Sequence, residues 1–280
     1  MKIAITGAAG LFGSGLVRVL SRSHEVNPLT HADLDITKRD DVRAAFRRIV
    51  PQLVIHPAGT PDIDLCEADP ARGFLLNFHG TRNVMDGAQE AGAAVAYIST
   101  DAVFDGKKNT PYTEADPAIP PTVYGRTKLR AEQLVLNGPN NFAFRVSALF
   151  GPGKTNFVQK VLENIRAGKE VVVASDQLGS ATYTVDAAQK IMEVVEALRP
   201  GLYHLSNQGA CSRLELAQRA AELAGLDAHQ VIGKPSDQMG RRAPRLKYAV
   251  MDMRALARAG FELSRKWQDA LAEYIRELSN

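Results

Sequence analysis

The fold is decided by the stretch Ile3-Ala4-Ile5-Thr6-Gly7-Ala8-Ala9-Gly10-Leu11-Phe12-Gly13, residues 3–13. The apolar run at its start predicts a buried strand, and Leu16–Leu20 predicts a helix after the glycines. Strand, glycine-rich turn and helix in this order are typical of a dinucleotide-binding βαβ unit. The free N–H groups at the start of such a helix face the cofactor's phosphates.

The three glycines of this stretch each meet a different steric need. Gly7 allows a tight turn off the strand, Gly10 lets backbone approach a pyrophosphate, and Gly13 lets the helix pack closely on the sheet. A second strand is expected at Glu25–Leu29. This context favours dinucleotide binding over a loop that merely contains small residues.

Composition places the chain among ordinary globular proteins. Its 280 residues are 45% hydrophobic and 23% charged, which allows one large domain and a smaller appended one. The net charge of +3 comes without a basic run, so no nucleic-acid partner is expected. No membrane partner is expected either, because no run of the sequence approaches 18 consecutive apolar residues. Isolated Cys66 and Cys211 predict free thiols in a cytoplasmic protein without a metal site.

Cofactor contacts are expected where the next strands end. Thr30-His31 stands after the second strand in place of an acid, which favours NADPH but leaves NADH possible. Asp35 either contacts the adenine edge or belongs to a stretch that caps the following helix, expected at 40–50. A third strand, Leu53–His56, leads into Pro57-Ala58-Gly59, again small residues at the crevice.

The catalytic candidates lie in the middle of the chain. A long helix is expected at Pro70–Ala91, with Asn77 inside it positioned to bond a neighbouring strand, and a fourth strand at Val95–Ser99. After a loop at 106–121, a helix at 122–136 carries Tyr124 and Lys128, which share one face at spacing four.

Tyr124 and Lys128 together suit carbonyl reduction. A free phenol has a pKa near about 10, and a nearby ammonium lowers it toward the neutral range, where a proton donor works best. A hydroxyl from Ser99 or Thr100 is expected to share the substrate oxygen. Taken by themselves, Tyr124 and Lys128 could also simply lie on a solvent-exposed face of the helix.

These motifs identify a family. The chain resembles the extended short-chain dehydrogenase/reductases and, within them, the dTDP-4-dehydrorhamnose reductase family. The resemblance runs nearly end to end through segments 99–106, 124–129, 156–158, 176–180, 201–206 and Trp267. It implies an α/β fold, a Rossmann-type doubly wound parallel sheet with a smaller C-terminal α/β substrate-binding part, and by analogy a homodimer.

The resemblance also implies a reaction and its residues. NADPH or NADH would reduce C4 of a nucleotide-linked 4-keto-6-deoxy sugar. Tyr124 would protonate the alkoxide, Lys128 would hold the nicotinamide ribose, and Thr100 would bond the keto oxygen. The cofactor-binding candidates are Gly7, Gly10, Leu11, Phe12, Gly13, Thr30, His31, Asp35, Ile36, Ala58, Gly59, Thr60, Asn77, Ser99, Tyr124 and Lys128.

The sequence departs from the family at positions that resemble its substrate pocket. Ala102 and Ala148 replace aromatic residues, and Ala181 replaces a proline. Since a buried aromatic covers about 150–250 Å², the pocket is expected to be wider or filled differently. A different ketone substrate is therefore an open alternative.

The second half is expected to bind substrate. The predicted division is 1–150 for NAD(P) binding and 151–280 for an interleaved substrate-binding part, with helices near 155–167, 185–197, 212–224 and 267–278. The substrate-binding candidates are Thr100, Asp101, Ala102, Ala148, Asn156, Gln177, Tyr183 and Arg245. The basic cluster 241–247 either binds the substrate's diphosphate or is surface charge. Trp267 is expected in the core.

Two further functions remain alternatives at this stage. A nucleotide-sugar epimerase of the same superfamily would hold and recycle its cofactor. A non-catalytic NADP-binding subunit, resembling the regulatory β subunit of methionine adenosyltransferase, would fit the loss of pocket aromatics. The intact Thr100, Tyr124 and Lys128 favour catalysis.

Overall fold

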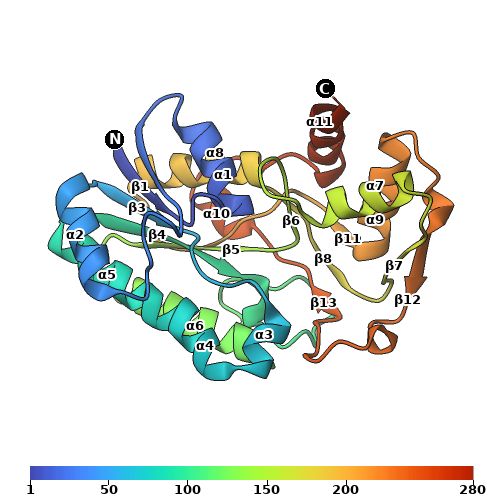
Figure 1. The fold of residues 1–280 in the computed structure, drawn as a ribbon, viewed down its shortest axis with the longest axis horizontal. Coiled ribbons are helices and arrows are strands. Elements are labelled where there is room, and N and C mark those ends of the chain that lie inside the picture. Colours follow the sequence, from blue (N-terminus) through green and yellow to red (C-terminus); the bar gives the residue numbers. More distant parts are fainter. Residues whose placement is uncertain (280) are drawn as a thin grey trace.

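A parallel six-stranded sheet forms the centre of the molecule, in the order β10-β5-β4-β3-β1-β2 (Figure 1). The computed structural model describes residues 1–279. The strands of this sheet are β1 (Lys2–Thr6), β2 (Glu25–Leu29), β3 (Leu53–His56), β4 (Ala94–Thr100), β5 (Phe142–Val146) and β10 (Gly201–His204). The strand order reverses between β1 and β3, and in such sheets ligands bind beyond the carboxyl ends at that point.

Helices cover both faces of this sheet because the side chains of each strand alternate between them. Ile3 and Ile5 of β1 face α1 (Leu11–Leu20) and α8 (Thr184–Glu196), and α10 (Arg254–Arg258) joins this layer. Ala4 faces the opposite layer of α2 (Arg39–Ile49), α5 (Gly80–Glu90) and α6 (Val123–Leu136). The doubly wound architecture predicted from the sequence is thereby confirmed.

The long helix expected at Pro70–Ala91 is present from Pro70 to Glu90, and it contains a π-helical turn that the sequence did not predict. After α3 (Ile63–Ala68), the chain forms α4 (Pro70–Phe74), a π-helical turn (Leu75–His79) and then α5. A π turn accommodates an extra residue and often marks a functional site. Here the turn contains Asn77, whose side chain is bonded to a neighbouring loop and to α6.

A second, smaller part lies at the right of Figure 1. Its small sheets are β11-β8-β13, β12-β7 and β6-β9. Its elements are β6 (Leu149–Phe150), α7 (Phe157–Arg166), β7 (Val171–Ala174), β8 (Leu178–Ser180), β9 (Thr182–Tyr183), β11 (Ala210–Ser212), α9 (Arg213–Leu223), β12 (Val231–Lys234), β13 (Tyr248–Ala249) and α11 (Trp267–Ser279). Trp267 is 5% exposed within this part's core, as predicted.

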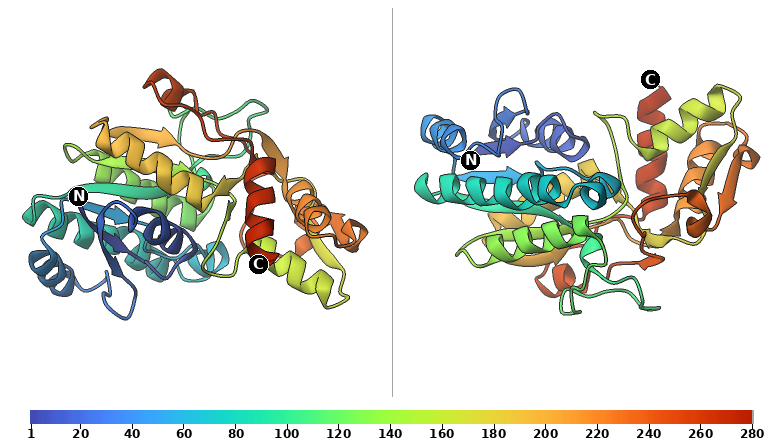
Figure 2. Two further views of the ribbon diagram at one scale, coloured as in Figure 1. Left: turned by 90° about the horizontal axis from the view of Figure 1, so that it is seen from above. Right: turned by 60° about the horizontal axis from the view of Figure 1, so that its bottom comes forward.

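The two parts share the chain rather than dividing it at one point. The segment that contains α8 and β10 returns from the smaller part to pack on α1 and to pair with β5. Both views of Figure 2 show α11 standing between the two bodies. Arg265 joins them further, because its guanidinium bonds Asp186 of α8 and Glu273 of α11.

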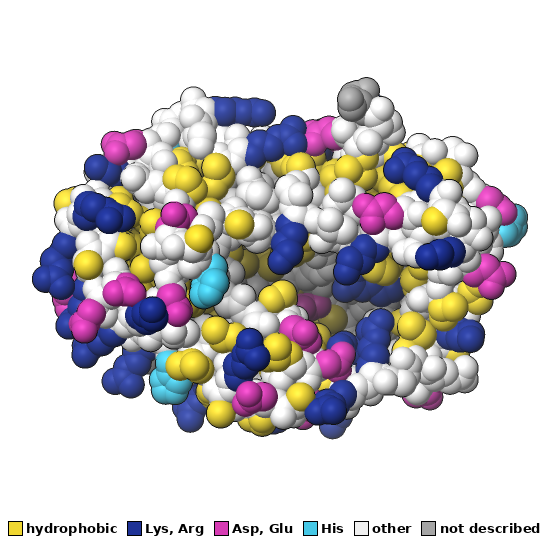
Figure 3. All heavy atoms as spheres, viewed as in Figure 1, with side chains coloured by type: hydrophobic (Ala, Val, Ile, Leu, Met, Phe, Trp, Pro, Cys, Tyr) yellow, Lys and Arg dark blue, Asp and Glu magenta, His cyan; other side chains and the backbone are white. Residues whose placement is uncertain are grey.

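The face seen in Figure 3 is hollowed between the two parts, and Lys and Arg side chains gather along the hollow. No helix within residues 1–279 has the length and apolar character needed to cross a membrane. Cys66 and Cys211 are both free and buried.

Candidate functional site

The glycine turn after β1 has the geometry that a bound pyrophosphate requires. Gly7 has φ +62°, a left-handed conformation, and a Cβ there would lie 2.9 Å from the Ala58 backbone. A Cβ on Gly13 would lie 2.2 Å from the Gly7 carbonyl oxygen. These two contacts allow only glycine, so backbone and helix approach closely at the crevice.

The start of α1 is open to an anion. Gly10 is its N-cap and supplies no side-chain cap, and no acidic residue lies in the first turn. The N–H groups of this turn, which includes Leu11 and Phe12, therefore favour a negative group. A dinucleotide fits this cradle, and a larger residue at Gly7 or Gly13 would distort it by colliding with the backbone of Ala58 or of Gly7.

The acids near the end of β2 are occupied locally. Asp35 Oδ1 accepts hydrogen bonds from the Thr37 N–H at 3.0 Å and the Thr37 hydroxyl at 2.7 Å, which lower the Asp35 pKa. Asp33 accepts from Thr30 in the same manner, while His31 is exposed and Ile36 is buried. Asp35 therefore stabilises a local turn before α2, and its contact with the adenine edge stays a prediction.

Asn77 connects the cofactor edge to the catalytic helix. Its Oδ1 accepts from the Thr60 N–H at 2.8 Å, and its Nδ2 donates to the Thr127 hydroxyl at 3.0 Å. Gly59, at φ +144°, passes so close that a Cβ would lie 2.6 Å from Asn77 Oδ1. The loop that contains Ala58, Gly59 and Thr60 is thus held against α6.

Thr100, Tyr124 and Lys128 converge at the carboxyl end of β4. Thr122 caps α6 by accepting a hydrogen bond from the Gly125 N–H at 3.1 Å, which fixes the turn that carries Tyr124. Lys128 Nζ donates to the Ile98 carbonyl at 2.7 Å and lies 4.2 Å from the centre of the Tyr97 ring.

Ser99 does not contribute its side chain to this site, which corrects one cofactor-binding assignment. Its hydroxyl donates to Glu132 Oε2 at 2.6 Å, on the buried side of α6. Adjacent residues of a strand point to opposite faces, so Thr100 supplies the hydroxyl of the crevice.

Lys128 is not among the groups that shift the pKa of Tyr124, contrary to the expectation from the sequence. Burial raises the pKa of Tyr124 above its ordinary value, and the neighbouring Thr100 hydroxyl only partly opposes this. Burial also lowers the pKa of Lys128 to about 7. A buried ammonium that is easily neutralised, and whose proton is directed at Ile98, stabilises a phenolate less than the sequence predicts.

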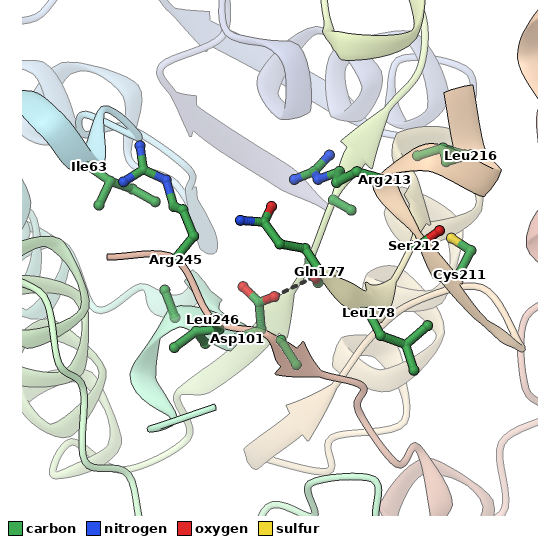
Figure 4. A pocket seen from close by; sticks show the side chains of 15 residues that line it. Ile63, Asp101, Gln177, Leu178, Cys211, Ser212, Arg213, Leu216, Arg245 and Leu246 are labelled. Atoms are coloured by element: carbon green, nitrogen blue, oxygen red, sulfur yellow. Dashed lines mark hydrogen bonds between the residues drawn. The ribbon is translucent and has the colours of Figure 1, made fainter. Parts of the chain in front are cut away.

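A cavity of about 130 Å³ adjoins these residues (Figure 4). Asp101, Ala102, Ser147 and Ala148 lie along one wall. Asp101 accepts hydrogen bonds from the Ser147 and Thr100 hydroxyls, and burial raises its pKa. Ala148 adopts φ +39°, an unusual conformation for a residue with a Cβ.

Two predicted substrate residues lie in the protein core instead, and these assignments are wrong. Tyr183 is fully buried, and its ring stacks on Phe150 with centroids 5.4 Å apart. Asn156 caps α7 and donates through Nδ2 to the Tyr274 hydroxyl at 2.6 Å. Tyr183 and Asn156 resembled binding residues in the sequence because the core of the smaller part contains tyrosines whose polar groups are hydrogen-bonded there.

Gln177 and Arg245 line the cavity, and their binding of substrate stays a prediction. Arg245 forms a two-bond ion pair with Asp64 of α3, at 2.7 and 3.2 Å. Arg241 and Arg242 are exposed. Of the basic cluster, Arg245 therefore lies in the cavity, where it also ties the smaller part to the larger one.

Arg213 and Ser147 line the same cavity and were not predicted from the sequence. Arg213 is the first residue of α9, and a lone arginine after a serine cap gives no periodic or motif signal. Ser147 is recognisable only once β5 and β4 are known to be neighbours.

Comparisons with known proteins cover the whole chain. The family model of the RmlD substrate binding domain matches residues 1–280. The spore coat polysaccharide biosynthesis protein SpsK of Bacillus subtilis is 36% identical, with 100% of this chain and 98% of that protein aligned. The dTDP-4-dehydrorhamnose reductase of Mycolicibacterium smegmatis is 34% identical, with 98% and 85% aligned.

A solved structure shows the same similarity in three dimensions. The dTDP-4-dehydrorhamnose reductase of Bacillus anthracis, in complex with NADP, superposes with a TM-score of 0.95 at 32% identity. The match covers 99% of this chain and 100% of that one.

Proposed function

The chain belongs to the RmlD substrate binding domain family, and on that premise we propose that it is an NAD(P)H-dependent reductase of a nucleotide-linked keto sugar. The single observation that carries this proposal is the convergence of Thr100, Tyr124 and Lys128 beside a glycine cradle made for a pyrophosphate. The names of the reductases from Mycolicibacterium smegmatis and Bacillus anthracis support a dTDP-linked 4-keto-6-deoxy sugar as the substrate.

Three side chains have roles in the proposed reaction. A bound NAD(P)H would supply the hydride. The Thr100 hydroxyl orients the keto oxygen, and the Tyr124 phenol delivers a proton to that oxygen. Lys128 holds the nicotinamide ribose, and its positive charge, when the site is filled, lowers the cost of forming the phenolate.

The proposal also covers which cofactor is bound, which residues bind it, and how the chain assembles. NADPH is favoured over NADH by Thr30-His31 in place of an acid, and by the NADP in the Bacillus anthracis structure. The cradle, Thr30, His31, Ile36 and the Asn77-held loop would bind it. The division into a cofactor part, 1–150, and a substrate part, 151–280, belongs to the proposal too. So do a homodimer and a cytoplasmic location, by analogy with the superfamily.

The first experiment follows the absorbance of NADPH or NADH with purified protein and dTDP-4-dehydrorhamnose. Tyr124→Phe removes the proton donor and is expected to lower kcat by about 10²–10⁴-fold. Tyr203→Phe is the matched control, because the Tyr203 hydroxyl bonds the Arg199 carbonyl away from the site. It is expected to keep the wild-type rate.

The alternatives predict different results in the same assay. Cofactor binding without turnover of any ketone would contradict the proposal and favour the non-catalytic subunit. Oxidation that Tyr124→Phe leaves unchanged would show that another residue donates the proton. Turnover of a different keto sugar alone would move the substrate assignment to the altered pocket of Ala102 and Ala148.

A further inference from the structure

Arg213 lines the cavity and forms no direct ion pair within residues 1–279. Arg213 occupies the first position of α9, and its guanidinium carbon lies 5.1 Å from the centre of the Phe157 ring. Within residues 1–279, no acid pairs with this guanidinium and no group accepts a hydrogen bond from it. Arginine keeps its charge in proteins, so a half-buried positive charge here has only the through-space attraction of Asp101 to stabilise it.

Gln177 presents a second unused donor to the same space. Its side-chain Nε2 is buried and has no hydrogen-bond partner within residues 1–279. The Arg213 N–H donates to the Gln177 carbonyl at 3.3 Å, so the two residues are held side by side by their backbones. Figure 4 shows both side chains pointing into the cavity.

The charges around the cavity leave an excess of positive charge at Arg213. Arg245, on the other side of the cavity, is neutralised by its ion pair with Asp64. Asp101 is the acid that attracts Arg213 through space, but it accepts hydrogen bonds from Ser147 and Thr100 and none from the guanidinium within residues 1–279. Arg241 adds a further positive charge in the neighbourhood.

We propose that Arg213 and Gln177 form an oxyanion subsite that binds an anionic group of the substrate. The guanidinium offers two parallel N–H donors to a planar or tetrahedral oxyanion, and Gln177 Nε2 adds a third donor. This proposal rests on the proposed function. It adds a specificity-determining residue, since a neutral keto compound would leave both donors unpaired in the cavity.

The oxyanion has two possible sources on a nucleotide sugar. One is the diphosphate between nucleoside and sugar. The other is a carboxylate on the sugar ring, for which the space beside Ala102 and Ala148 lies in the same cavity. Both the diphosphate and the carboxylate present oxygens to which the N–H donors of Arg213 would bind. The subsite is therefore defined as one for an oxyanion, and the experiment below identifies which of the two it binds.

Calorimetric titration of the full chain tests the subsite without any need for turnover. The ligands are dTDP with thymidine as its neutral counterpart, and UDP-glucuronate with UDP-glucose, which differ only in a carboxylate. Arg213→Met keeps the packing on Phe157 but removes the charge. Arg219→Met is the matched control on the same helix, where Arg219 is exposed and pairs with Glu222.

The expected result is a loss of anion affinity in Arg213→Met of about 10- to 100-fold, with thymidine binding and Arg219→Met unchanged. Weakened dTDP binding would assign the diphosphate as the source. Weakened UDP-glucuronate binding, with dTDP and UDP-glucose unaffected, would assign the carboxylate. Gln177→Leu, expected to lose about 3- to 10-fold, is the second variant if Arg213→Met does not fold.

The proposal is overturned if the wild-type protein binds neither anion, or if Arg213→Met and Arg219→Met bind every ligand equally. Its failure is distinct from failure of the proposed function, which is measured separately by cofactor oxidation. A protein that oxidises NADPH with a ketone while Arg213→Met binds anions normally would keep the reductase activity and lose only this subsite.

Discussion

The pKa of His56 is determined by its buried surroundings. It is fully buried between Thr6 and Thr81, whose hydroxyls contact Nδ1 at 2.7 Å and Nε2 at 3.0 Å. Burial, with a smaller contribution from the Lys128 charge, lowers the His56 pKa to about 3. The imidazole is therefore neutral in the folded protein over the whole physiological range.

Acid should weaken the fold through this histidine. As the pH falls below about 6.5, the unfolded chain binds a proton that folded His56 does not, so stability decreases until the pH approaches about 3. The slope contributed is up to about 1.4 kcal/mol per pH unit. Buried His204, whose pKa is also lowered to about 3, adds an effect of the same sign.

Urea denaturation between about pH 7 and 4 measures this slope. His56→Gln is expected to be less stable near neutrality but to lose stability less steeply on acidification, because one of the two titrating histidines is gone. An identical slope in wild type and variant would show that His56 is protonated in the fold.

Ala148 should tolerate glycine unusually well. Its φ of +39° costs an alanine about 1–2 kcal/mol, whereas glycine adopts this region freely. Ala148→Gly is expected to be neutral or to stabilise by up to about 1 kcal/mol. Ala143→Gly, in buried β5, is the control and should destabilise. Thermal unfolding compares them, and equal losses would rule out relief of strain.

Residues of the site differed in how far the sequence predicted them. Thr100, Tyr124 and Lys128 were found because spacing on one strand end and one helix face determines their neighbourhood. Arg213 was missed because its importance comes from a cavity that forms only when β11, which leads into α9, pairs with β8. Tyr183 was misassigned because aromatic residues suit both cores and binding sites.

At the scale of elements, the π turn Leu75–His79 sets the position of the cofactor loop. Asn77→Leu would leave the Thr60 N–H and the Thr127 hydroxyl without their partner. The expected cost is about 1–3 kcal/mol of stability, together with weaker NADPH binding because the loop of Gly59 and Thr60 is released.

Urea denaturation and titration of NADPH fluorescence test this effect. Asn164→Leu is the control, because exposed Asn164 only bonds the Lys160 carbonyl one turn earlier in α7. Asn77→Leu that matches this control in both measurements would mean that the π turn does not support the loop.

Element positions were largely predictable, while their irregularities were not. Apolar runs predicted β1, β3 and β4 because the inner strands of a doubly covered parallel sheet are buried, whereas the edge strand β2 is largely exposed or half-buried. The π turn follows from what Asn77 contacts 17 and 50 residues away, at Thr60 and Thr127, and no local pattern encodes those partners.

At the scale of the whole molecule, the sheet is completed from the second half of the chain. A fragment of residues 1–150 would lack β10 beside β5 and α8 against α1. It would expose apolar residues such as Phe142 and Leu16, which are buried in the full chain. We expect this fragment to show no cooperative unfolding, and the full chain to unfold in one transition.

Circular dichroism on heating, with tryptophan fluorescence for the full chain, makes the comparison. A fragment that melts sharply at a temperature close to that of the full chain would contradict the expectation. The pairing of β10 with β5 was not predicted, since pairing across some 60 residues depends on how the intervening part folds.

The late arrival of β10 also matters during protein synthesis. At typical elongation rates of about 5–20 residues per second, the ribosome needs roughly 3–10 s to make the chain between β6 and the end of β10. Throughout that interval the hydrogen-bonding edge of β5 is bare. A nascent chain in this state is a natural client for chaperones, and crowded polysomes are where its misassembly would begin.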